Sequence, residues 1–84
     1  YIGVTHNSMN YQPLIVIDKK KIYIDTFEEE LHAAITFDFY SILLHGAKAK
    51  TNFNYTKGHV KHMLEEFVAS GYKFGPESFV HMWN

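Results

Sequence analysis

The chain has 84 residues and a formal net charge of −1, with eight lysines and no arginine against nine acidic residues. The absence of cysteine excludes disulfides, thiolate metal sites and cysteine nucleophiles. A chain of this length is expected to form one small domain, and no apolar run is long enough to cross a membrane.

The first third of the chain contains three segments with strand character. These segments are residues 1–6, 11–18 and 21–27, and the last of them alternates and is rich in β-branched and aromatic side chains. A polar turn at residues 7–10 separates the first two segments, and Lys19-Lys20 forms a tight connection between the second and third. Such short connections predict an antiparallel meander.

A single helix is predicted over residues 28–45. Three glutamates open this segment, neither Gly nor Pro interrupts it, and Gly46 follows it. The sequence therefore predicts an α+β fold, in which a three-stranded antiparallel sheet packs on one α-helix. Phe39 and Leu43 add a further i,i+4 pair, so the apolar surface is too broad for a helix that rests on one sheet alone.

Residues 56–84 are predicted to form a C-terminal helical extension of the domain at residues 1–55. Apolar residues recur with helical spacing from Val60 to Val68, and Ser70-Gly71 ends the pattern. Pro76 is expected to open a short turn that carries Phe79, Val80 and Trp83. The extension could cover the Phe39–Leu43 flank, cover the outer face of the sheet, or pack on a partner, and the sequence leaves these alternatives open.

Short matches to one known family run in register through residues 1–53. They are Tyr1, Gly3, Val4, Thr26-Phe27, Ala33-Ala34, Asp38, Leu44, Gly46, Lys48-Ala49-Lys50 and Asn52-Phe53. On these residues the chain resembles the AP2/ERF DNA-binding domain, most closely the apicomplexan type, because the composition is rich in Lys, Asn, Tyr and Ile. The resemblance covers residues 1–55 at most, and the extension lies outside it.

The resemblance implies that the outer face of the sheet enters the major groove of double-stranded DNA, as in a nuclear transcription factor. It places Thr5, Asn7 and Tyr23 at base edges, and Lys19, Lys20 and Lys21 at phosphates. Asparagine can pair with adenine, so A·T-rich targets are expected. Three lysines against two aspartates give residues 1–27 a net charge of only +1, so binding is expected to be weak or to need assistance.

An alternative function follows from the apolar side chains of the sheet. Alternation predicts that Tyr11, Ile15, Ile17 and Tyr23 share the outer face, while Leu14, Val16, Ile22 and Ile24 lie against the helix. Exposed apolar patches mark interfaces. The outer face, or the Phe39–Leu43 flank, would then serve a protein partner or a homodimer without autonomous DNA binding.

No enzyme, cofactor or metal ion is expected. The sequence contains no nucleophile elbow, phosphate loop or paired-carboxylate constellation. His59 and His62 have ligand spacing on a helix, but neither a cysteine nor an acidic residue in a suitable register completes a metal site.

Overall fold

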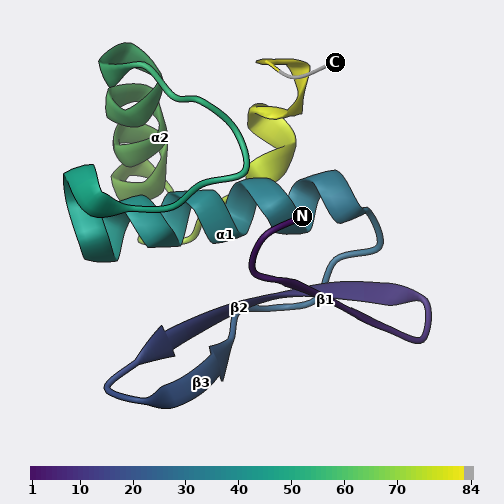
Figure 1. Ribbon diagram of the computed structural model, residues 1–84. Helices are drawn as coiled ribbons and strands as arrows, with labels where there is room; N and C mark the ends of the chain where they lie inside the picture. The colour runs from purple at the N-terminus through teal and green to yellow at the C-terminus, as the bar shows by residue number, and fades with distance from the viewer. Residues whose placement is uncertain (83–84) are drawn as a thin grey trace.

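The computed structural model describes residues 1–82 and confirms the α+β fold (Figure 1). The sheet has the order β1-β2-β3, with strands at Val4–Asn7, Asn10–Ile17 and Lys20–Tyr23. The helices are α1 (Glu30–His45) and α2 (Lys57–Ala69), and short 3₁₀ turns cover Gly46–Lys48, Pro76–Ser78 and Val80–Met82. Trp83 lies outside the described residues, so its expected place in the last turn has no observation to compare.

Two tight hairpins set the register of the sheet. Asn7 pairs with Asn10 across the first turn, and Ile17 pairs with Lys20 across the second. The second turn is therefore Asp18-Lys19 rather than the predicted Lys19-Lys20. Asp18 and Lys19 both adopt positive φ, 50° and 65°, which matches the twist that two-residue hairpins favour.

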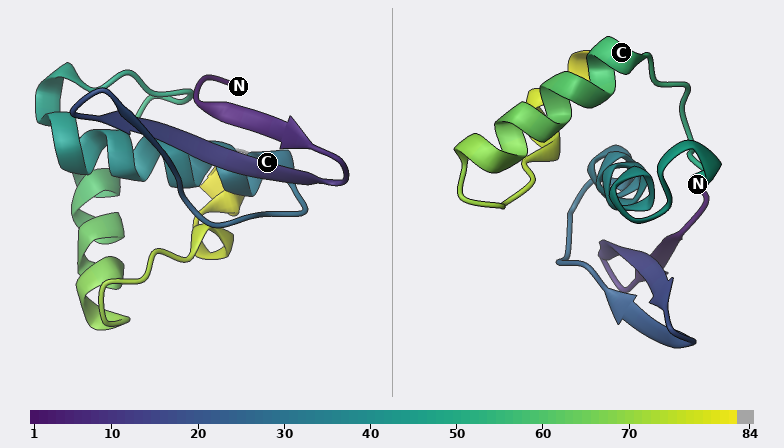
Figure 2. Two further views of the ribbon diagram at one scale, coloured as in Figure 1. Left: turned by 90° about the horizontal axis from the view of Figure 1, so that it is seen from below. Right: turned by 90° about the vertical axis from the view of Figure 1, so that its left-hand side faces the viewer.

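Helix α1 lies between two layers. Figure 2 shows the sheet on one side of α1, and α2 with the C-terminal turns on the other. Every residue from 33 to 39 is buried, which requires cover on more than one side of the helix. The broad apolar surface predicted for this helix is thus explained by two packing partners.

The extension covers the Phe39 flank, which was one of the three alternatives that the sequence left open. Ile35, Phe39, Met63 and Phe79 form one buried cluster. The ring of Phe39 stacks on Phe74 with 4.3 Å between centroids. Leu43, predicted to share this cover, remains 43% exposed. Because the extension packs on α1, it leaves the outer face of the sheet open.

The fully buried carboxylate of Asp38 joins α1 to the segment that follows it. Its Oδ1 accepts hydrogen bonds from the backbone N–H and the Nδ2 of Asn52, at 2.8 and 2.9 Å. Its Oδ2 accepts from the backbone N–H of Phe53 at 3.2 Å and from the hydroxyl of Tyr55 at 2.7 Å. Asn52 also donates through Nδ2 to the carbonyl of Ile2 at 3.0 Å, and its Oδ1 accepts from the N–H of Ile2. The network therefore ties the N-terminal segment to α1.

Burial raises the pKa of the Asp38 carboxyl, and its hydrogen bonds oppose that shift. Burial, followed by the hydrogen bond to Asp38 and the charge of that carboxylate, raises the pKa of Tyr55. The Tyr55 hydroxyl therefore keeps its proton at neutral pH and remains a donor to Asp38.

Replacement of Gly3 by alanine is expected to destabilise the fold by about 2 to 3 kcal/mol. Gly3 has a φ of 73°, and an added Cβ would lie 2.1 Å from Cε1 of the Phe37 ring. Urea denaturation followed by circular dichroism measures the loss. Gly71→Ala is the matched control, because Gly71 has a φ of 74° with open space around it. Equal losses in the two variants would contradict a steric role for Gly3.

Candidate nucleic-acid interface

The register of the sheet identifies the residues of its outer face, the face turned away from α1. Paired residues on neighbouring strands share a face, and Pro13 and Ile15 are buried on the side of α1. The outer face, used in this sense throughout, therefore consists of Thr5, Asn7, Asn10, Gln12, Leu14, Val16, Lys21 and Tyr23.

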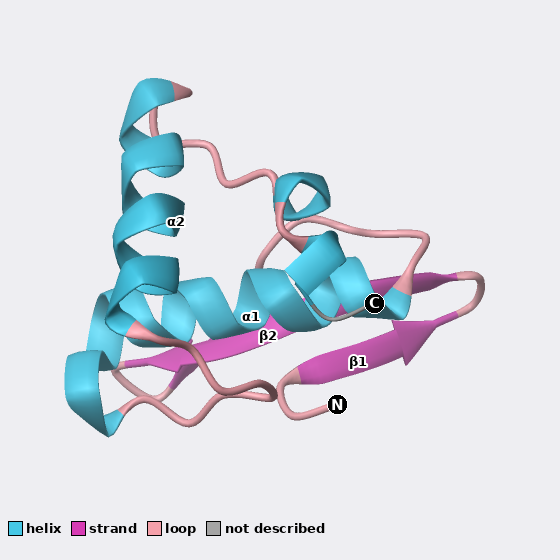
Figure 3. Ribbon diagram, turned by 90° about the horizontal axis from the view of Figure 1, so that it is seen from above, coloured by secondary structure: helices cyan, strands magenta, loops and turns pink. Residues whose placement is uncertain are grey.

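Four of the six residues predicted to contact DNA lie on this face. Thr5 and Asn7 come from β1, and Lys21 and Tyr23 come from β3. Figure 3 shows β1 and β2 running side by side beneath α1. Because β1 pairs with the first half of β2 and β3 with the second half, the face has a polar end and an end that is apolar apart from Lys21.

The remaining two predicted contacts lie beside the outer face. Lys19 occupies the β2–β3 turn, and Lys20 pairs with Ile17, which places it on the opposite face of the sheet. All three lysines are exposed. They gather at a hairpin that projects away from α1 (Figure 2). Lys21 therefore lies on the outer face, whereas Lys19 and Lys20 lie beside it at the same end.

Hydrogen bonds position two of the polar side chains at this end of the face, Thr5 and Gln12. The Thr5 hydroxyl donates to the carbonyl of Gln12 at 3.1 Å. The Nε2 of Gln12 donates to the hydroxyl of Thr26 at 3.2 Å, across the neighbouring segment. Asn10 and Gln12 were not among the predicted contacts. They lie on the same face as Asn7 and bring two further amide side chains to it.

The predicted faces of β2 were wrong. Tyr11, Ile15 and Ile17 belong to the side of the sheet that faces α1, and Ile15 is only 4% exposed. Leu14 and Val16 take the outer face instead. Alternation could not orient this strand, because residues of both parities are apolar. The length of the turn could have corrected the prediction. A two-residue turn pairs odd-numbered residues of β2 with even-numbered residues of β3, so Ile15 and Tyr23 must lie on opposite faces.

The β2–β3 hairpin carries four exposed large apolar side chains. Val16 and Tyr23 are each more than half exposed on the outer face. Ile17 and Ile22, on the opposite face, are 38% and 42% exposed. The hairpin thus presents apolar side chains on both faces, next to its lysines.

Comparisons with protein-family models, with curated proteins and with solved structures find no match. Within residues 1–82, no helix is long and apolar enough to span a membrane, and no three His, Asp or Glu side chains gather as metal ligands. The Nδ1 of His59 instead accepts from the backbone N–H of Thr56 at 3.2 Å, in the capping box of α2. The groups that the outer face offers to a ligand are hydroxyls, amides, one lysine and apolar side chains.

Proposed function

We propose that this chain is the DNA-binding module of a nuclear transcription factor, and that the outer face of its sheet enters the major groove. The observation that carries the proposal is that Thr5, Asn7, Lys21 and Tyr23 share a face that neither helix covers. The resemblance of residues 1–53 to the AP2/ERF domain supports the same mode of binding.

The outer face offers the chemistry that base recognition needs. The major groove is wide enough for a β-ribbon, and an asparagine amide can bond to N6 and N7 of adenine. Asn7 would take this role, and Tyr23 would pack against thymine methyl groups. Lys19, Lys20 and Lys21 would contact phosphates at the hairpin end. With so few cations, binding to an isolated duplex is expected to be weak and to improve with further domains or a second copy.

The test is selection from a randomised duplex DNA pool at about 50 mM and about 200 mM salt. An enriched sequence motif is expected, with affinity that falls as salt rises. Replacement of Lys19, Lys20 and Lys21 by alanine is expected to reduce the logarithmic salt slope by about 0.9 for each phosphate contact that is lost. Fluorescence anisotropy on the selected duplex measures the slope.

The matched control replaces Lys57, Lys61 and Lys73 by alanine. These lysines belong to the extension, on the other side of α1, and the change in net charge is the same. The control is expected to keep the wild-type salt slope. The proposal fails if no motif is enriched at either salt concentration, or if both triple variants change the slope equally.

A protein-interaction module is the second candidate function, and the exposed apolar hairpin favours it. Val16 and Tyr23 would form the centre of such an interface. Apolar contacts depend little on salt, whereas phosphate contacts weaken steeply. Self-association that is insensitive to salt and is abolished by Val16→Lys, measured by analytical ultracentrifugation, would favour this function over DNA binding.

A further inference from the structure

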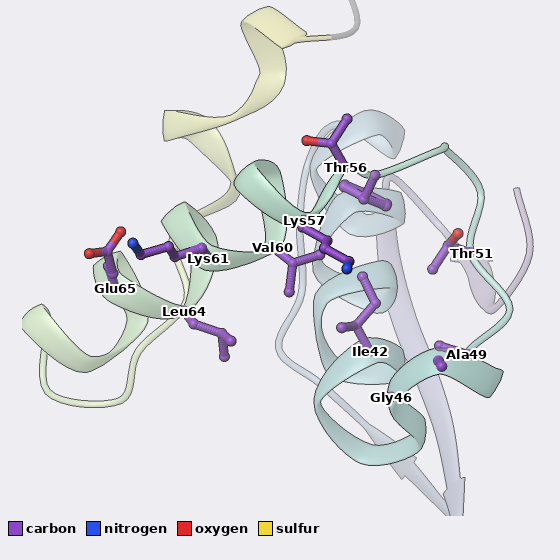
Figure 4. Close-up of a pocket in the computed structure, with 12 residues that line it drawn as sticks. Ile42, Gly46, Ala49, Thr51, Thr56, Lys57, Val60, Lys61, Leu64 and Glu65 are labelled. Atoms are coloured by element: carbon purple, nitrogen blue, oxygen red, sulfur yellow. The ribbon is translucent and has the colours of Figure 1, made fainter.

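An apolar groove lies on the side of α1 that faces away from the sheet. Its volume is about 630 Å³. Figure 4 shows the side chains that line it, which come from the C-terminal half of α1, the following loop and α2. Its apolar lining comprises Ile42, Ala47, Ala49, Val60 and Leu64.

The groove forms because α2 contributes only part of its apolar stripe to the core. Val60, Leu64 and Phe67 have the spacing of one helix face. Phe67 packs against the core, and the centroids of its ring and the Phe39 ring are 4.9 Å apart. Leu64, one turn earlier, packs against the core and also lines the groove, whereas Val60, two turns earlier, lines the groove with Ile42. Both Leu64 and Val60 are partly exposed. An apolar groove between helices is a surface on which an amphipathic peptide can dock.

The rim of the groove carries an excess of positive charge. Lys57 and Lys61 lie one turn apart on α2, and both are exposed. Neither forms an ion pair among the described residues. Glu65 is the single acidic residue in the lining. The charge of the rim therefore complements an acidic occupant, since opposite charges across an interface steer and orient binding.

We propose that this groove binds an acidic amphipathic segment of a partner protein. Apolar side chains of the segment would enter between Ile42, Val60 and Leu64, and its carboxylates would meet Lys57 and Lys61. Because α1 separates the groove from the outer face of the sheet, occupancy of the two surfaces does not compete (Figure 2). The proposal is independent of DNA binding.

The experiment is selection of a phage-displayed library of random peptides on the purified chain. Acidic peptides with interspersed apolar residues are expected to be enriched. In amide nuclear magnetic resonance spectra, a selected peptide is expected to shift the signals of Ala47, Ala49 and Val60 and to leave those of Thr5 and Asn7 in place. The double variant Lys57→Glu, Lys61→Glu is expected to weaken the peptide about tenfold or more, through repulsion of its carboxylates.

The matched control is Lys19→Glu, Lys20→Glu, which changes the net charge equally on the other side of α1. It is expected to bind the peptide as the wild type does, and circular dichroism verifies that both double variants are folded. The proposal is overturned if the enriched peptides are not acidic, if no peptide is enriched, if both double variants weaken binding equally, or if the shifted signals lie on the sheet.

Discussion

Asp38→Asn is expected to destabilise the protein by about 3 to 5 kcal/mol, as when one partner of a buried charged network is removed. Small domains have total stabilities of about 5 to 15 kcal/mol, so this variant is expected to be largely unfolded or close to it. The loss is expected although the substitution changes a single atom of a fully buried side chain.

The physical reason is that every partner of Asp38 donates. Oδ1 accepts from both nitrogens of Asn52, and Oδ2 accepts from the N–H of Phe53 and the hydroxyl of Tyr55. An asparagine has one acceptor oxygen and one NH₂ group. In either orientation, the NH₂ group would face a backbone N–H and leave that donor buried without an acceptor.

Urea denaturation followed by circular dichroism measures the loss, with Asp18→Asn as the matched control. Asp18 is exposed and has a φ of 50°, a conformation that asparagine tolerates. The control is expected to remain within about 0.5 kcal/mol of the wild type. Tyr55→Phe removes one donor and is expected to cost about 1 kcal/mol. An Asp38→Asn variant as stable as Asp18→Asn would contradict the role given to the network.

Phe39→Ala is expected to cost about 3 to 5 kcal/mol, and to unfold the sheet and the extension together. Phe39 is 2% exposed, and its ring contacts those of Tyr40, Phe67 and Phe74 at centroid distances of 5.2, 4.9 and 4.3 Å. Truncation would leave a cavity bounded by α1 on one side and the extension on the other. A deletion of residues 56–84 is expected to unfold the remainder, because it would expose the same side of α1.

The measurement is hydrogen exchange and urea denaturation of the variant, with Tyr23→Ala as the control. Tyr23 is 53% exposed on an edge strand, so its truncation is expected to cost less than about 1 kcal/mol. Amides of β2 and of α2 are expected to lose protection together in Phe39→Ala. If α2 alone loses protection while β2 retains it, then the extension is a separate folding unit, and Phe39 does not couple it to the sheet.

The sequence predicted the elements well, because local chemistry sets them. Gly46 ends α1 with a φ of 58°, as expected for a residue that follows a helix. Thr56 caps α2 by accepting from the N–H of His59 at 3.1 Å, close to where the helical pattern was predicted to begin. These features depend on a few residues that are neighbours in the sequence, and they can therefore be predicted from it.

The sequence also predicted most of the candidate DNA contacts on one face, but it misplaced β2. Thr5, Asn7, Lys21 and Tyr23 do share the outer face, whereas Ile15 is buried beneath α1 and Val16 replaces it. The second half of β2, Leu14–Ile17, is apolar at every position, so alternation predicts two faces there but does not indicate which one is buried. The turn register and the packing of α1 made that choice.

The sequence by itself determined three strands, two helices and an apolar surface on α1 that needed a second partner. Only the tertiary structure decided that the extension is this partner, which leaves the outer face of the sheet open and creates the groove beside Val60. It also decided that Asp38 meets Asn52, Phe53 and Tyr55, residues 14 to 17 positions away along the chain. Such contacts join distant segments, and local periodicity carries no information about which buried surfaces will meet.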